Sequence, residues 1–259
     1  MPYDISKVKR NFGVAVTPTA IVLFQELERF NKLIETITRT LHQLKKAFAG
    51  EIGMDSVLEN ISVALYNGTL PEKWARLAPD TQKNLAGWMD HFQKRIDQYT
   101  NWSGANEPVV LWLSGLHVPE TYLAALMQMA CRKNNWPLDR SVIYTTVSKF
   151  FKPDDVEERP DQGCYVYGLY LEGARWDMKE HCLKRSYPKV LIEELPILTI
   201  IPTEIHRLKL QNTFKTPVYT TSNRRNALGV GLVLEANLAT REHISHWIFQ
   251  GVCLVLNTD

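Results

Sequence analysis

The chain has 259 residues, of which 45% are hydrophobic and 22% are charged, as in an ordinary globular protein. Thirty basic residues against 28 acidic ones leave a formal charge of +2, whereas nucleic-acid-binding proteins usually carry a marked basic excess. No apolar run approaches the roughly 20 residues of a membrane-spanning helix, and the amino terminus lacks the apolar stretch of a secretion signal. Composition therefore predicts a folded, soluble intracellular protein that binds neither nucleic acid nor a membrane.

The first half of the chain has the apolar spacing of helices, beginning with one long helix. Thr17 is a suitable helix cap and Pro18 a suitable first helical residue, and Gly50 is a favourable stop. Between them apolar residues recur at alternating steps of four and three: Leu23, Leu27, Phe30, Ile34, Ile37, Leu41, Leu44 and Phe48. A helix of about 30 residues would be about 45 Å long, which exceeds the width of a compact domain of this size. We therefore expect one end to extend past its own core.

Two roles for this helix stay open on spacing alone: an amphipathic core helix, or a helix that docks on a separate body. Residues 34–48 are expected to pack on the chain's own helices. The earlier residues Leu23, Leu27 and Phe30 are the candidate interface with a partner, or with a second copy of this protein.

Shorter helical segments follow up to about residue 135, and the pattern then changes. β-Branched and aromatic residues alternate, separated by Gly, Pro and Asn, and predict these strands: 142–147, 165–171, 181–186, 197–201, 218–221, 230–236 and 247–257. Because no amphipathic helix separates consecutive strands, an antiparallel sheet is favoured over a parallel one. The sequence thus predicts an α+β fold, with a helical subdomain at 1–139 and an antiparallel β-barrel at 140–259.

Motifs that carry chemistry are weak. No GxxxxGK[ST] phosphate-binding loop occurs, and the four cysteines include no CxxC pair. His243 and His246, beside Glu242, would point to opposite faces of an extended strand, which disfavours a metal site. Glu193 and Glu194 are typical of a solvated turn. We therefore predict no catalytic residue, no cofactor, no metal ion and no enzymatic activity.

Several unusual strings resemble the C-terminal domain of dynein heavy chains. They are QELERFNKL (25–33), LWLSGL (111–116), NNWPLD (134–139), GLYLEGA (168–174) and PVYTTSNRR (217–225). Each is weak alone, but they fall in family order from about residue 20 to the end. The resemblance is to the axonemal, inner-arm branch of the family.

This resemblance implies a structural and regulatory domain that lies on the AAA+ ring of its own heavy chain and modulates microtubule-based ciliary motility. The ATPase modules, the stalk and the microtubule-binding tip would precede this segment, and Asp259 would end a much longer polypeptide. Microtubules and other dynein subunits would be reached only through that full-length polypeptide, in the cytoplasm and the axoneme of a cilium or flagellum. The alternative is a small-molecule-binding or hydrolytic β-barrel domain.

Overall fold

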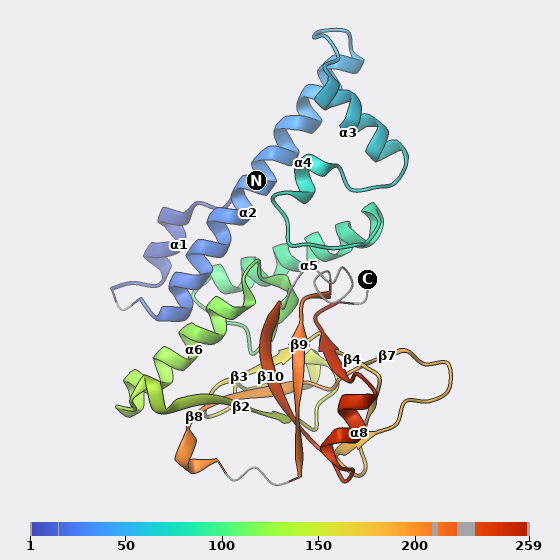
Figure 1. Cartoon of the computed structure of the whole chain (residues 1–259). Helices are drawn as coiled ribbons and strands as arrows, with labels where there is room; N and C mark the ends of the chain where they lie inside the picture. The colour runs from blue at the N-terminus through green and yellow to red at the C-terminus, as the bar shows by residue number, and fades with distance from the viewer. Residues whose placement is uncertain (1, 15, 209–211, 222–230, 258–259) are drawn as a thin grey trace. The chain divides into compact units, whose positions relative to one another are not determined.

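The computed structural model describes residues 2–14, 16–208, 212–221 and 231–257 (Figure 1). The protein divides into two compact units. The first consists of Met1–Val16, Ala20–Glu107 and Gly115–His117, and the second of Thr17–Thr19, Pro108–Ser114 and Val118–Asp259. Within the described ranges, none of the helices combines the length and the hydropathy that a membrane span requires.

The first unit is helical. Its helices are α1 (Ile5–Asn11), α2 (Pro18–Phe48, whose first two residues fall in the second unit), α3 (Ser56–Tyr66), α4 (Glu72–Ala75) and α5 (Leu85–Ser103). The predicted long helix is confirmed, because α2 has 31 residues and begins at Pro18. The Asp55 side chain accepts a hydrogen bond from the backbone N–H of Leu58 at 2.7 Å and so starts α3, which folds back beside the end of α2 (Figure 1).

Aromatic side chains join these helices. The Trp74 indole N–H donates to Oγ1 of Thr40 at 3.0 Å, and its ring lies 6.2 Å from that of Trp88. The Trp88 ring stacks on Phe92 at 5.2 Å, and Phe92 lies 5.2 Å from Phe30 of α2. Aromatic pairs of this kind stabilise a core by about 0.5–1.5 kcal/mol each beyond their buried area.

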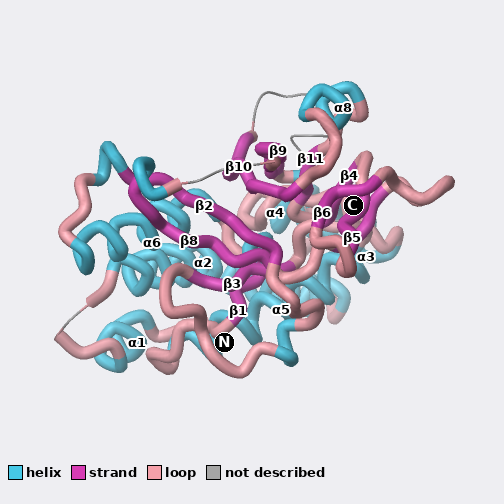
Figure 2. Tube along the Cα trace, turned by 90° about the horizontal axis from the view of Figure 1, so that it is seen from below, coloured by secondary structure: helices cyan, strands magenta, loops and turns pink. Residues whose placement is uncertain are grey.

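The second unit contains the strands and the helices α6 (Pro119–Asn134) and α8 (Ile244–Phe249). A four-stranded sheet has the order β1 (Val110–Trp112), β3 (Cys164–Tyr167), β8 (Leu198–Glu204), β2 (Ser141–Val147). A five-stranded sheet has the order β10 (Leu232–Ala239), β9 (Thr213–Tyr219), β11 (Cys253–Val255), β4 (Tyr170–Glu172), β7 (Ile192–Glu194). A hairpin pairs β5 (Arg175–Asp177) with β6 (Cys182–Lys184), and α6 packs on β2 and β8 (Figure 2).

The α+β class is confirmed, but the predicted antiparallel β-barrel is wrong. Over the ranges that the structure describes, none of the sheets closes on itself, and two strand pairs, β1–β3 and β9–β11, are parallel. The edge strands β2 and β10 come together without a backbone ladder, because the N–H of Asn237 donates to the hydroxyl of Thr145 at 2.7 Å. A side-chain hydrogen bond stands where a closed barrel would have strand pairing. The division of the protein at residues 139 and 140 stays a prediction.

Residues 247–257 also differ from their prediction as a strand. They hold the end of α8, then a turn at Gly251, whose φ is +65°, and then β11. Trp247 is buried and its indole N–H donates to the hydroxyl of Thr240 at 2.6 Å. The apolar run therefore contains one helical turn and one strand.

Candidate functional site

The groups considered for chemistry lie apart. His243 caps α8 and accepts from the backbone N–H of Ser245 at 3.3 Å. Glu193 and Glu194 are successive residues of β7 and so face opposite sides of its sheet. The four cysteines are buried and form no disulfide, and no cluster of three or more His, Cys, Asp or Glu in the described ranges could hold a metal ion. Part of the string at 217–225 lies outside the described residues.

The residues predicted as a partner interface are buried. Leu23, Leu27 and Phe30 each have 0% exposed area. The Phe30 ring lies 5.2 Å from the rings of both Phe92 and Tyr99, which belong to the same unit. Their role at an interface stays a prediction, and their burial favours the alternative of a core stripe.

Exposed apolar side chains lie instead along the other end of α2 and on α3. Leu41 is 41% exposed and Phe48 is 67% exposed, although Ile34 and Leu44 of the same repeat are buried. Tyr66 is 91% exposed and follows Val63 by three positions, so both lie on one side of α3. We call the following residues the α2–α3 apolar surface: Leu41, Phe48, Ile52, Met54, Val63 and Tyr66.

A buried charged cluster surrounds Glu26 of α2. Its Oε2 accepts from the Tyr99 hydroxyl at 2.9 Å and from the backbone N–H of His117 at 2.6 Å, and lies 3.0 Å from Nδ1 of His117. Its Oε1 accepts from the guanidinium of Arg29 at 2.9 Å. Glu26 has no exposed area, so these donors replace the water that a carboxylate would otherwise bind.

The same cluster holds residues 115–117 in the first unit. Nε of the buried Arg95 donates to the carbonyl oxygen of Gly115 at 2.7 Å, and the Tyr99 hydroxyl lies 3.1 Å from that oxygen. Nε2 of His117 lies 3.3 Å from the carbonyl oxygen of Leu77. Helices α2 and α5 thus both bind this short segment.

The cluster shifts the pKa of its members. Burial alone would raise the pKa of Glu26, but the hydrogen bonds and charge of His117, together with the Tyr99 hydroxyl, lower it below its ordinary 4.5. Burial, followed by the charge of Glu26, raises the pKa of Tyr99 well above 10.0. Burial lowers the pKa of Arg95, and Tyr99 and Glu26 oppose that change. The arrangement suits a structural ion network.

Sequence reasoning missed this cluster because it placed Glu26 among the solvated charges of the long helix. Glu26 follows Leu23 by three residues and precedes Phe30 by four. Those steps put its side chain on the buried apolar face, and they are the signal that could have found it.

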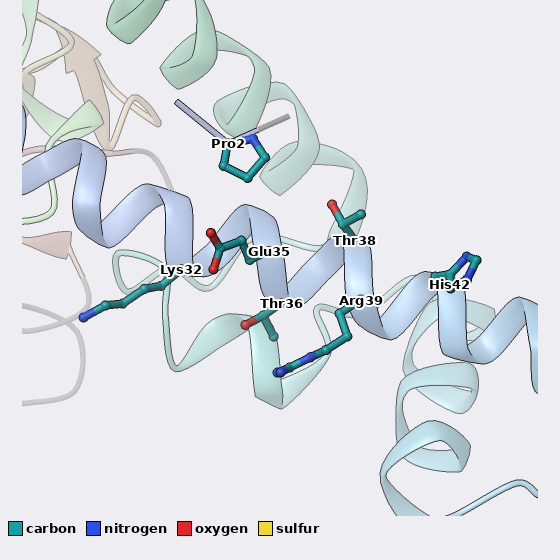
Figure 3. Close-up of a pocket in the computed structure, with 7 residues that line it drawn as sticks. All are labelled: Pro2, Lys32, Glu35, Thr36, Thr38, Arg39 and His42. Atoms are coloured by element: carbon teal, nitrogen blue, oxygen red, sulfur yellow. The ribbon is translucent and has the colours of Figure 1, made fainter. Parts of the chain in front are cut away.

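A cavity of about 540 Å³ lies beside α2. Its lining residues are Pro2, Lys32, Glu35, Thr36, Thr38, Arg39 and His42. Figure 3 shows Lys32, Thr36 and Arg39 on one side of the helix, whereas Glu35 and Thr38 are on the side of Pro2. The charged groups do not converge on one point, so the arrangement offers no acid–base or nucleophilic pair.

Comparison with known proteins places these features in a family. Residues 1–256 match a family model described as the C-terminal domain of the dynein heavy chain. The sequence is 58% identical over 257 residues to dynein axonemal heavy chain 10 of Homo sapiens. It is 54% identical over 258 residues to the dynein-1-alpha heavy chain, flagellar inner arm I1 complex, of Chlamydomonas reinhardtii. The predicted resemblance to an inner-arm axonemal heavy chain is confirmed.

A more distant relative is the dynein beta chain, flagellar outer arm, of Chlamydomonas reinhardtii, which is 35% identical over 241 residues. The three alignments cover 99%, 100% and 93% of this protein, but only 6%, 6% and 5% of the respective relatives. The 259 residues therefore span about one-sixteenth of the length of the relatives that they match.

Proposed function

Because this protein belongs to the family of dynein heavy-chain domains found at the C-terminus, we propose that it is a non-catalytic domain that docks on the AAA+ ring of its own heavy chain. There it modulates microtubule-based motility in the axoneme of a cilium or flagellum. The names of its relatives, which are axonemal and flagellar heavy chains, support this location.

The α2–α3 apolar surface is the observation that carries the docking proposal. Contiguous exposed apolar groups mark contacts with other proteins, and burying one large aliphatic or aromatic side chain is worth roughly 1.5–3 kcal/mol. Phe48 and Tyr66 are its most exposed members. A domain docked there biases the motor's cycle if its contacts differ in free energy between two ring conformations.

The test is a heavy chain that carries this domain with Phe48→Ser and Tyr66→Ser together. ATP turnover and microtubule gliding should change relative to the wild-type motor, since the domain is no longer held on the ring. The matched control is Ile21→Ser, which changes another exposed apolar side chain of α2. Wild-type gliding and ATP turnover in the double variant would contradict docking through this surface.

The non-catalytic part of the proposal has its own test. The 259 residues include no GxxxxGK[ST] loop, so the domain should neither bind nor hydrolyse ATP. Isothermal titration calorimetry at micromolar protein measures this directly. Tight ATP binding would overturn the non-catalytic assignment and leave the docking proposal standing.

A further inference from the structure

Two short turns form an exposed basic corner in the second unit, consisting of residues 132–140 and 204–207. The turns are the 3₁₀ segments Leu138–Arg140 and Ile205–Arg207. They are neighbours because the antiparallel register of β2 and β8 places Ser141 opposite Glu204. Figures 1 and 2 both show the end of α6, the start of β2 and the end of β8 together. The corner contains the string NNWPLD, to which the proposed function assigns no role.

Arg207 is held in place within this corner. Its guanidinium lies 5.1 Å from the centre of the Trp136 ring, and its Nε lies 3.0 Å from a carboxylate oxygen of Glu204. The Arg207 side chain nevertheless remains 56% exposed. A guanidinium fixed by stacking and by an ion pair loses less conformational entropy when it binds a further group, and its planar fork suits a carboxylate.

The surroundings of Arg207 combine positive charge with apolar area. Residues 132–140 and 204–207 include four arginines or lysines but only two carboxylates, Asp139 and Glu204. Leu138 is 55% exposed and Ile205 is 51% exposed, one on each turn. Arg140 separates Leu138 from β2, so cationic and aliphatic groups alternate along the corner.

We infer that this basic corner binds an acidic protein segment that places carboxylates on Arg140 and Arg207 and an aliphatic side chain on Leu138 and Ile205. Charge complementarity gives the sign of the partner, and the two exposed aliphatic residues give its second requirement. This binding does not depend on the ring-docking proposal, which concerns a surface of the first unit.

The same observations disfavour nucleic acid and membrane. The face of Trp136 that a nucleobase would stack on is occupied by Arg207. The carboxylates of Asp139 and Glu204 lie among the cations and would repel phosphate groups. An acidic peptide, whose carboxylates are spaced by apolar residues, avoids both problems.

The experiment measures fluorescence anisotropy of a labelled peptide of Glu with interspersed Leu, titrated with the 259-residue protein. The double variant Arg140→Glu, Arg207→Glu should bind the peptide roughly tenfold more weakly or worse, because charge reversal removes the attraction. The matched control, Lys45→Glu with Lys73→Glu, reverses two exposed charges of the first unit and should bind within about twofold of wild type. Leu138→Ser with Ile205→Ser should also weaken binding.

Arg207 packs on Trp136, so its replacement can disturb the fold. The second variant, Arg132→Glu with Arg140→Glu, leaves that stack intact and should weaken binding in the same direction. Absence of peptide binding to the wild-type protein would overturn the inference, as would equal losses in the corner variants and the control. Tighter binding of a uridine oligonucleotide, or of vesicles containing phosphatidylserine, would likewise overturn it.

Discussion

The hydroxyl group of Tyr99 donates a hydrogen bond to Oε2 of Glu26 at 2.9 Å, joining positions 73 residues apart in the sequence. Both side chains have 0% exposed area, so the bond lies in a low-dielectric core. Glu26 therefore connects α2 to α5 through a charge that water does not reach.

Replacing Glu26 with Gln should destabilise the protein by about 3 kcal/mol or more at neutral pH, because the buried Arg95 would lose its nearby negative charge. Urea denaturation measures the free energy of unfolding. Glu28→Gln is the matched control, since Glu28 is an exposed carboxylate two residues away on the same helix. Equal stability of the two variants would contradict a structural role for the Glu26 charge.

The pH dependence of stability gives a second test of Glu26. Its pKa is lower in the folded protein than its ordinary 4.5, so the unfolded state takes up this proton at higher pH. The stabilisation is therefore complete above the ordinary pKa, and it is lost as the pH falls through the lowered value. The free energy of unfolding should fall with acid in the wild type, and less steeply in Glu26→Gln. Parallel curves for the two proteins would refute the assignment.

Leu23→Ser with Leu27→Ser separates the two roles of the long helix. Both side chains are fully buried, so the double variant should lose at least about 4 kcal/mol of stability, seen as a large drop in melting temperature. Leu41→Ser with Phe48→Ser changes exposed members of the same repeat and should lose much less. A double Leu23, Leu27 variant with wild-type melting and reduced association would instead support the predicted interface.

Gly163→Ala should be strongly destabilising. Gly163 has φ +82°, and a Cβ added there would lie 1.8 Å from the carbonyl oxygen of Ile200, a backbone atom of β8. The clash and the left-handed conformation together predict a loss of roughly 2–4 kcal/mol. Gly13→Ala, where φ is +67° but no atom lies within 4 Å of the added Cβ, isolates the conformational part. Similar melting temperatures for the two variants would show that the clash is relieved.

Limited proteolysis should cut the protein after Glu157 or Glu158. These residues are exposed, follow the 3₁₀ turn Pro153–Asp155 and belong to no helix or strand. Exposed irregular segments adapt to a protease active site, whereas helices resist it. Glutamate-specific protease and mass spectrometry identify the first cut. Early cleavage within α2 or α5 would contradict this prediction.

Local signals let the sequence predict α2 almost to the residue, since its period and its start at Pro18 depend on neighbours along the sequence. Strand pairing depends on contacts between distant residues, and no local pattern announced that the N–H of Asn237 would bind the side chain of Thr145. For the same reason Glu26 was placed in solvent, since its donors come from positions 99 and 117. What could not be predicted are the contacts that bring remote segments together.

Gly115–His117 belongs to the first unit but is flanked in sequence by residues of the second. During synthesis the ribosome adds about 5–20 residues per second, and domains commonly fold as they emerge. Residues 1–107 can emerge with α2 and α5 complete, yet the Glu26 carboxylate then lacks both donors of His117. The nascent first unit therefore holds an incompletely neutralised charge until residue 117 leaves the exit tunnel, and its final packing step waits for synthesis of its neighbour to begin.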